Sequence, residues 1–176
     1  MSDLAAAAGV SRATAYRYFP SRGTLISAVI DESLRPVRHW TSSAVDGAQR
    51  IDELFENTLP RLQEYEAQMR AALQLALEHW SAARTRSLGK PPFTRGFRRA
   101  ILERNAAPLR ARLGPKAFDR LLKALSLVYG IESFVVLKDI WGVREPEIEA
   151  IVRWVAAALV SASIAQTSGR QPRVSR

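Results

Sequence analysis

The stretch S-R-A-T-A-Y-R-Y-F-P-S-R, residues 11–22, decides the fold of this chain. Ser11 is a suitable helix N-cap, because its hydroxyl can accept a hydrogen bond from the free backbone N–H groups of the next turn. Pro20 cannot continue a helix, so we expect one helix between these two residues. The Ala-rich run at 3–8 favours another helix, which Gly9 ends because glycine tolerates left-handed backbone. The pattern predicts a helix, a tight turn and a second helix, with Ser21 capping a third.

The predicted second helix carries side chains suited to a polyanion. Residues 11–22 contain three arginines and no acidic residue. Small side chains let a helix approach a groove floor, polar groups near its N-terminus reach base edges, and the other polar groups face phosphates. The corresponding residues are the small Ala13 and Ala15, the base-edge candidates Arg12 and Thr14, and the phosphate candidates Tyr16, Arg17, Tyr18 and Arg22. Any small basic helix pair shares this composition. The residues alone therefore fit equally well a basic surface that does not bind DNA.

Residues 7–25, A-A-G-V-S-R-A-T-A-Y-R-Y-F-P-S-R-G-T-L, closely resemble the signature of the tetracycline-repressor-like (TetR) family of transcription regulators. The resemblance implies that residues just after Gly-Val-Ser and the tyrosine one turn later contact DNA. It also implies that the basic residue opening the next helix binds a phosphate. That residue is Arg22 instead of the usual lysine, which keeps the charge and adds a planar fork. The expected DNA-binding residues are Ser11, Arg12, Ala13, Thr14, Tyr16, Arg17, Tyr18 and Arg22.

The chain departs from the family pattern at its start, because the family has one more helix ahead of the Ala-rich one. Without that helix, the side chains of Leu4, Val10 and Phe19 lose packing partners, and a head of roughly 45–50 residues is already marginal in buried surface. We expect that the true start lies upstream of Met1. The alternative is a truncated form with impaired DNA binding.

Composition agrees with a globular protein that has a polyanionic partner. The 176 residues are 47% hydrophobic, enough for one or two domains with a core. The formal net charge of +9 favours nucleic acid or another anionic surface. Basic residues also gather in a middle stretch, either as solvated helix faces or as a second nucleic-acid surface. They are Arg84, Arg86, Lys90, Arg95, Arg98, Arg99, Arg104, Arg110, Arg112 and Lys116.

Other features concern the compartment. The chain has no cysteine, which excludes disulfides and agrees with a reducing compartment. No apolar run approaches the roughly 20 residues of a membrane span, and no signal peptide is evident. We therefore expect a cytoplasmic protein without a membrane partner.

Beyond Arg50 apolar residues recur at helical spacing and no alternating strand pattern occurs, which predicts an all-α protein. A long helix is expected from 118 to 140, ended by Trp141-Gly142. The clearest loop is expected at 87–92. The predicted domains are an N-terminally incomplete helix-turn-helix domain with its connecting helix at 1–37, a helical regulatory and dimerisation domain at 38–165, and a disordered basic tail at 166–176.

The last predicted helix is apolar on more than one face. With Trp154 and several alanines it shows more apolar surface than a monomer of this size hides, which predicts a partner. The family resemblance implies a homodimer, because the last two helices of TetR-like proteins form a four-helix interface. A buried central helix is the alternative. The expected interface residues are Leu125, Val136, Ile148, Ile151, Val155 and Leu159.

The resemblance also implies that helices between Arg50 and Ile140 enclose an apolar cavity for a small-molecule effector. Such pockets are aromatic and apolar, with a few polar groups that orient the ligand. The candidate lining residues are Tyr65, Met69, His79, Trp80, Phe97, Tyr129 and Phe134, and each could equally belong to the core.

Nothing in the sequence favours an enzyme. His39 and His79 lack the spacing of a metal site, and no nucleophile or phosphate-loop motif occurs, so we expect no catalytic residue, no metal and no cofactor. The predicted function is a DNA-binding transcriptional regulator, a repressor that releases a palindromic operator on binding a small hydrophobic effector. The alternative is a truncated ligand-binding and dimerisation module without specific DNA binding.

Overall fold

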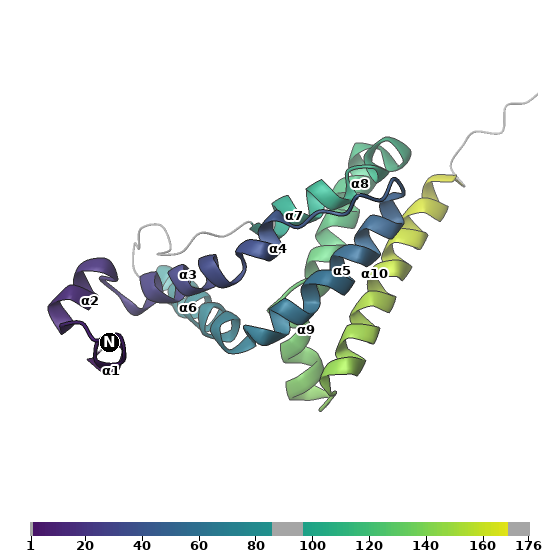
Figure 1. Ribbon diagram of the computed structural model, residues 1–176. Coiled ribbons are helices and arrows are strands. Elements are labelled where there is room, and N and C mark those ends of the chain that lie inside the picture. Colours follow the sequence, from purple (N-terminus) through teal and green to yellow (C-terminus); the bar gives the residue numbers. More distant parts are fainter. Residues whose placement is uncertain (1, 86–96, 169–176) are drawn as a thin grey trace, which may run out of the picture. The chain divides into compact units, whose positions relative to one another are not determined.

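The computed structural model describes residues 2–85 and 97–168, which form helices and no strand, as predicted (Figure 1). Their contacts divide the chain into two units. The first unit contains α1 (Ser2–Ala7), α2 (Arg12–Tyr18), α3 (Arg22–Ser33) and α6 (Glu66–Thr85). The second, from Pro36 on, contains α4 (Arg35–His39), α5 (Gly47–Glu64), α7 (Phe97–Ala106), α8 (Leu109–Val128), α9 (Ile131–Phe134), the π-helical segment η1 (Val135–Ile140) and α10 (Glu145–Ser168).

The short helices of the first unit begin and end where the sequence predicts. Gly9 has a φ of 64°, the left-handed conformation that lets the chain turn between α1 and α2. Ser21 caps α3 by a capping box, in which its hydroxyl accepts from the Thr24 N–H and the Thr24 hydroxyl accepts from the Ser21 N–H, both at 3.1 Å. In this unit α1 packs on α2, and α3 packs on α6.

The second unit is built around α5, α8 and α10. The buried face of α5 includes Ile51, Leu54 and Phe55, which repeat at three and four residues. Helix α10 contacts both α5 and α8, through buried residues spaced by three or four: Ile148, Val152, Ala156, Val160 and Ser163. Gly47 lets α5 approach α8 closely, because a Cβ at that position would lie 2.5 Å from Leu109 Cγ.

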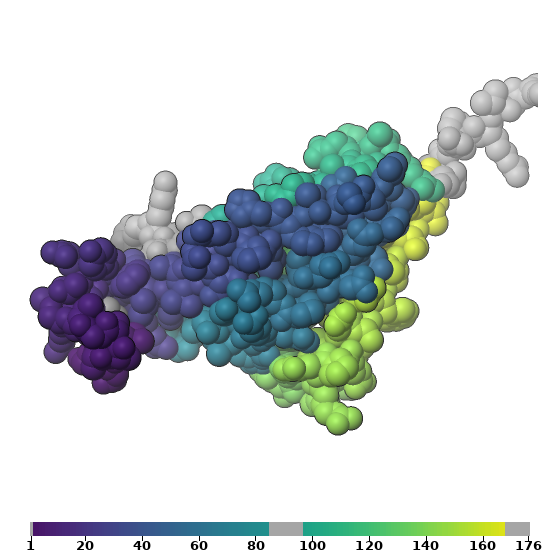
Figure 2. Space-filling model, viewed as in Figure 1, coloured from purple at the N-terminus to yellow at the C-terminus, as the bar shows by residue number. Residues whose placement is uncertain are grey.

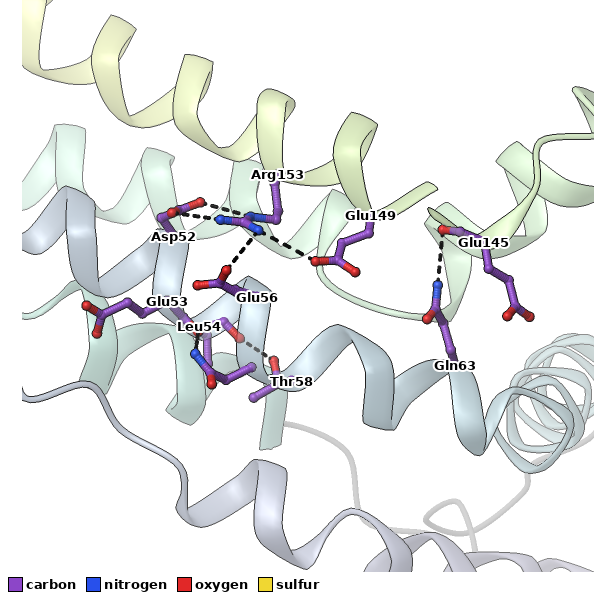
Figure 3. A network of polar contacts seen from close by, with 10 residues as sticks. Asp52, Glu53, Leu54, Glu56, Thr58, Gln63, Glu145, Glu149 and Arg153 are labelled. Carbon is purple, nitrogen blue, oxygen red and sulfur yellow. Dashed lines mark hydrogen bonds and ion pairs between the residues drawn. The ribbon is translucent and has the colours of Figure 1, made fainter. Parts of the chain in front are cut away.

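A polar network fixes α10 on α5 (Figure 3). The Arg153 guanidinium donates to both carboxylate oxygens of Asp52, at 3.1 and 3.0 Å. Glu56 accepts from it at 3.3 Å, and Glu149 lies 3.6 Å away. The hydrogen bond to Asp52 raises the pKa of Arg153 further, so this charge is permanent. One arginine therefore compensates carboxylates from two helices.

The expected long helix from 118 to 140 is wrong, because the chain breaks at Tyr129-Gly130 and continues as α9 and η1. A tertiary contact lies at the break. The Arg98 guanidinium donates to the Ser126 carbonyl at 2.8 Å and to Glu132 at 2.6 Å. A Cβ at residue 130 would lie 2.2 Å from an Arg98 nitrogen, so a larger residue there would displace the end of that side chain.

Other expectations meet the structure as follows. Pro36 was expected to kink or end the helix that Ser21 caps, and the structure agrees, because α3 ends at Ser33 and Pro36 lies in the first turn of the next helix, α4. A domain boundary was predicted after residue 37, but the contacts group α6, which lies beyond it, with α3. The regulatory domain at 38–165 therefore stays a prediction. The predicted tail at 166–176 starts inside α10, which continues to Ser168. The expected loop at 87–92 and residues 169–176 lie outside the described residues.

Candidate nucleic-acid interface

Helix α2 presents most of its side chains to solvent. Arg12, Ala13 and Arg17 are exposed, as is Arg22 at the start of α3. The Tyr18 side chain is 68% exposed and that of Tyr16 is 40% exposed, which is unusual for tyrosine in a small helical unit. The structure therefore leaves the predicted contact residues free to meet a ligand.

Two hydroxyl groups organise the N-terminus of α2. Ser11 accepts a hydrogen bond from the Thr14 N–H at 3.1 Å, which confirms it as the N-cap. The Ser11 and Thr14 hydroxyls also share a hydrogen bond of 2.8 Å. Thr14 is half-buried. These bonds hold the first turn of α2 in place, which is the turn that reads bases in helix-turn-helix proteins.

Arginine and tyrosine side chains pair along the same helix. The Arg12 guanidinium lies over the Tyr16 ring, 5.6 Å from its centroid, and Arg17 lies 5.3 Å from the centroid of Tyr18. Such cation–π contacts contribute about 0.5–1 kcal/mol at exposed sites. They orient two cations without neutralising them, so both charges stay available for phosphates or base edges. The sequence analysis placed these four residues on the interface but missed their pairing, although Arg12 and Tyr16 are one helical turn apart.

Arg22 occupies the first position of α3, where the backbone N–H groups of a helix start also attract anions. Its side chain is exposed. Together with the arginines of α2 it makes three exposed cations, with no acidic residue between positions 11 and 22. This arrangement suits a phosphate backbone.

Comparison with known families decides what this arrangement is. The model of "Bacterial regulatory proteins, tetR family" matches residues 1–29, which contain α1, α2 and the start of α3. Residues 1–29 are therefore similar to the DNA-binding segment of the tetR family. This match supports the prediction of a DNA-binding transcriptional regulator. No curated protein and no solved structure matches the chain.

The residues expected to line an effector pocket fall in both contact units. In the first unit Met69 is buried, Tyr65 and His79 are half-buried, and Trp80 is 59% exposed with Arg84 over its ring. In the second unit Phe134 and Tyr129 are buried. Phe97 is 37% exposed, and the Arg38 guanidinium lies 3.7 Å from its ring centroid. The effector pocket stays a prediction.

Tyr129 is the most distinctive of these residues, because its phenol is buried and hydrogen-bonded. Its hydroxyl lies 2.7 Å from the Thr58 hydroxyl, which donates to the Leu54 carbonyl at 2.5 Å. The Tyr129 ring packs against Phe55 with a centroid distance of 4.9 Å. Burial raises the pKa of Tyr129 from 10.0 to about 12. The sequence does not show Thr58 as the polar partner of Tyr129, because the two residues lie 71 positions apart.

Tyr129→Phe is expected to lower the free energy of unfolding by about 1 kcal/mol at pH 7, since one hydrogen bond is lost while Thr58 keeps its bond to Leu54. Between pH 10 and pH 12 the Tyr129 phenol is protonated in the folded protein but ionised in the unfolded chain, which favours unfolding. The contribution of Tyr129 to the free energy of unfolding is therefore full below pH 10 and falls by up to about 3 kcal/mol as the pH rises to about 12.

Urea unfolding of both proteins from pH 7 to pH 11.5 measures this effect, because titrations common to both cancel in the difference. The stability difference should shrink and then change sign above pH 10. Parallel stability curves over this range would contradict the assignment.

The residues expected at a dimer interface divide into two groups. Leu125 and Ile148 are fully buried within the chain, so including them was wrong. They repeat with the right period, but their side chains are covered by their own chain. Val136 is exposed, and Ile151, Val155 and Leu159 are half-buried at the border of the face that α10 buries. The exposed face of α10 instead carries Ala150, Trp154, Ala157, Ala158, Ser161 and Ala165.

Helix α10 also corrects the expectation about apolar runs. Glu145–Thr167 is long and apolar enough to cross a membrane by length and composition, with 28% of the stretch buried inside the structure. Arg153 lies within it and pairs with the acids of α5, and the buried residues pack on α5 and α8. These contacts are those of a helix belonging to a folded helical unit.

Proposed function

We propose that this chain is a transcriptional repressor that binds a palindromic operator as a homodimer and releases it on binding a small apolar effector. The observation that carries the proposal is the exposure of α2 with its ordered first turn and of Arg12, Arg17 and Arg22, in a segment that matches the tetR-family model. A recognition helix needs these properties, because its N-terminal residues contact base edges while flanking cations meet phosphates. The expected compartment is the cytoplasm.

Fluorescence anisotropy tests this function. The purified chain is titrated into a labelled duplex from the region upstream of its own gene, with unrelated competitor DNA, across a salt series. Preference for the labelled duplex at physiological salt is the expected result. Equal affinity for unrelated duplexes, lost as salt rises, would contradict the proposal, because it would show that the chain binds DNA only through non-specific charge attraction.

Tyr16→Ala is expected to weaken operator binding by about 1–3 kcal/mol, roughly 5- to 150-fold, because it removes a contact of α2 and frees Arg12 from its stacked position. The same anisotropy titration measures the loss. Val45→Ala is the matched control, since Val45 is 92% exposed outside α2 and should leave the affinity unchanged. Operator affinity equal to wild type in a folded Tyr16→Ala protein would remove the recognition-helix assignment.

We further propose that the dimer forms through the exposed face of α10. Between residues 150 and 165 this face runs along the helix at intervals of three, four and seven residues and contains no charged side chain: Ala150, Trp154, Ala157, Ala158, Ser161 and Ala165. Exposed Glu147 lies at its N-terminal end. Small side chains allow a second helix to approach closely, and Trp154 supplies a large apolar surface to bury. Effector binding would then shift the population of conformations toward one that no longer fits two successive major grooves.

One observation favours the alternative function, a ligand-binding and dimerisation module without specific DNA binding. Leu4 is 52% exposed and Val10 is 42% exposed, so the unit that holds α2 carries uncovered apolar surface. A head whose helices open readily would not hold a recognition helix rigidly. The salt series above separates the two functions, because only a rigid head gives preference for its own duplex.

A further inference from the structure

The start of α8 carries a concentration of positive charge that the proposed head does not use. Residues 109–123 contain five basic residues and one acidic residue, a net charge of +4. The acid, Asp119, is already paired with Lys123 at 2.7 Å. We define the remaining four cations as the α8 basic segment: Arg110, Arg112, Lys116 and Arg120. All four are exposed, and the green atoms of this part of α8 lie on the surface seen in Figure 2.

Neighbouring elements leave these charges uncompensated. Arg110 stacks on the buried Phe118 ring at 4.5 Å, and Arg120 donates to the neutral amide of Gln166 at 2.6 Å. Arg112 and Lys116 make no hydrogen bond or ion pair within the described residues. Gln166 belongs to the end of α10, and residues 154–168 of that helix are all uncharged. The acid of α7 at position 103 is paired with Arg99.

The placement of these cations costs the helix some stability. Gly114, with a φ of 73°, kinks α8, so Lys116 lies in the first turn of the straight part that follows. A positive charge at that end opposes the helix dipole. Lys116 and Arg120 are four residues apart, where like charges repel. Helix stability therefore does not explain why these cations occur here. Residues that destabilise their own helix in this way are commonly functional.

We propose that the α8 basic segment is a second DNA-binding surface, which contacts the phosphate backbone of duplex DNA without reading its sequence. Duplex DNA is the favoured partner because the α8 basic segment lacks exposed aromatic and large apolar side chains. Its apolar residues Leu109, Leu113 and Phe118 are buried, so it offers no side chains for insertion into a membrane and no aromatic platform for unpaired bases. Cations without such anchors fit the regular phosphates of a duplex.

The test uses the full chain with the cations of the head removed, Arg12→Gln, Arg17→Gln and Arg22→Gln together. Anisotropy with a labelled duplex of unrelated sequence is recorded across a salt series in this background. We expect residual binding that strengthens at low salt. Adding Arg112→Gln and Lys116→Gln should reduce the slope of log K against log salt by about 2, because each phosphate contact contributes about 0.9.

The matched control adds Arg61→Gln and Arg99→Gln instead, two cations already paired with Glu64 and Glu103. It changes the net charge equally and should leave the slope unchanged. An equal loss in the control, or no duplex binding by the background protein at low salt, would overturn the proposal. So would variants that lose binding to phosphatidylserine vesicles while keeping duplex binding. Operator preference of the otherwise wild-type chain is measured separately and should survive Arg112→Gln with Lys116→Gln.

Discussion

Phe134→Ala is expected to lower the free energy of unfolding by about 3–5 kcal/mol, the usual cost of truncating a fully buried phenylalanine. Phe134 is 0% exposed and ends α9, beside the break that follows α8. Removing its ring leaves a cavity in the second unit, because the packed helices around it relax only partly. Urea or thermal unfolding followed by far-ultraviolet circular dichroism measures the change.

Phe97→Ala is the matched control for this prediction. Both phenylalanines were expected to line an effector pocket, but Phe97 is 37% exposed and is covered by Arg38. Its truncation should cost about 1 kcal/mol, the size of a partly exposed cation–π contact with some lost packing. If Phe134→Ala folded with wild-type stability, the ring would not be core. It would then face a space that a small molecule could fill.

Trp154→Glu is expected to dissociate the proposed homodimer, with a loss of about 4 kcal/mol or more, roughly a thousandfold in the dissociation constant. Trp154 is 71% exposed in the single chain and lies in the middle of the uncharged face of α10. At an interface it would bury its ring at the centre, where truncation costs most. The glutamate would place an unpaired charge there. Sedimentation velocity over a concentration series measures the equilibrium.

Trp80→Glu is the control for this variant, because Trp80 is 59% exposed on α6, outside the proposed interface. It should keep the wild-type association. A Trp154→Glu protein that sediments as a dimer would place the interface elsewhere. The fold should survive the substitution, since the side chain of Trp154 faces solvent in the single chain.

Local signals predicted the parts of the fold that local chemistry controls. Ser11, Gly9 and Ser21 set helix ends through their own hydroxyl groups or backbone freedom, so the first three helices appear where the sequence places them. Acidic residues in the first turn of α10, Glu145 and Glu147, likewise suit the start of a helix. The same signals located the exposed residues of α2, because a recognition helix carries its chemistry within one short segment.

The failures have tertiary causes. The break at Gly130 lies beside Arg98 of another helix, and no window of sequence around residue 130 shows that neighbour. Periodicity groups Ile148 with other apolar residues of α10, but it does not state which of two apolar faces turns inward. Asn105 shows the same limit, because its buried amide accepts from the Ser42 N–H at 3.2 Å and donates to the Ile101 carbonyl at 2.9 Å. These bonds join the segment between α4 and α5 to α7, and no local sequence pattern predicts them.

The exposure of tryptophan has a spectroscopic consequence. The chain has four tryptophans, and Trp80, Trp141 and Trp154 are each more than half exposed. Indoles in water emit at long wavelength whether or not the chain is folded, so the intrinsic emission of an isolated protomer would shift little on denaturation. A protein chemist should choose circular dichroism to monitor denaturation and keep tryptophan emission for association, because covering Trp154 would shift its emission to shorter wavelength.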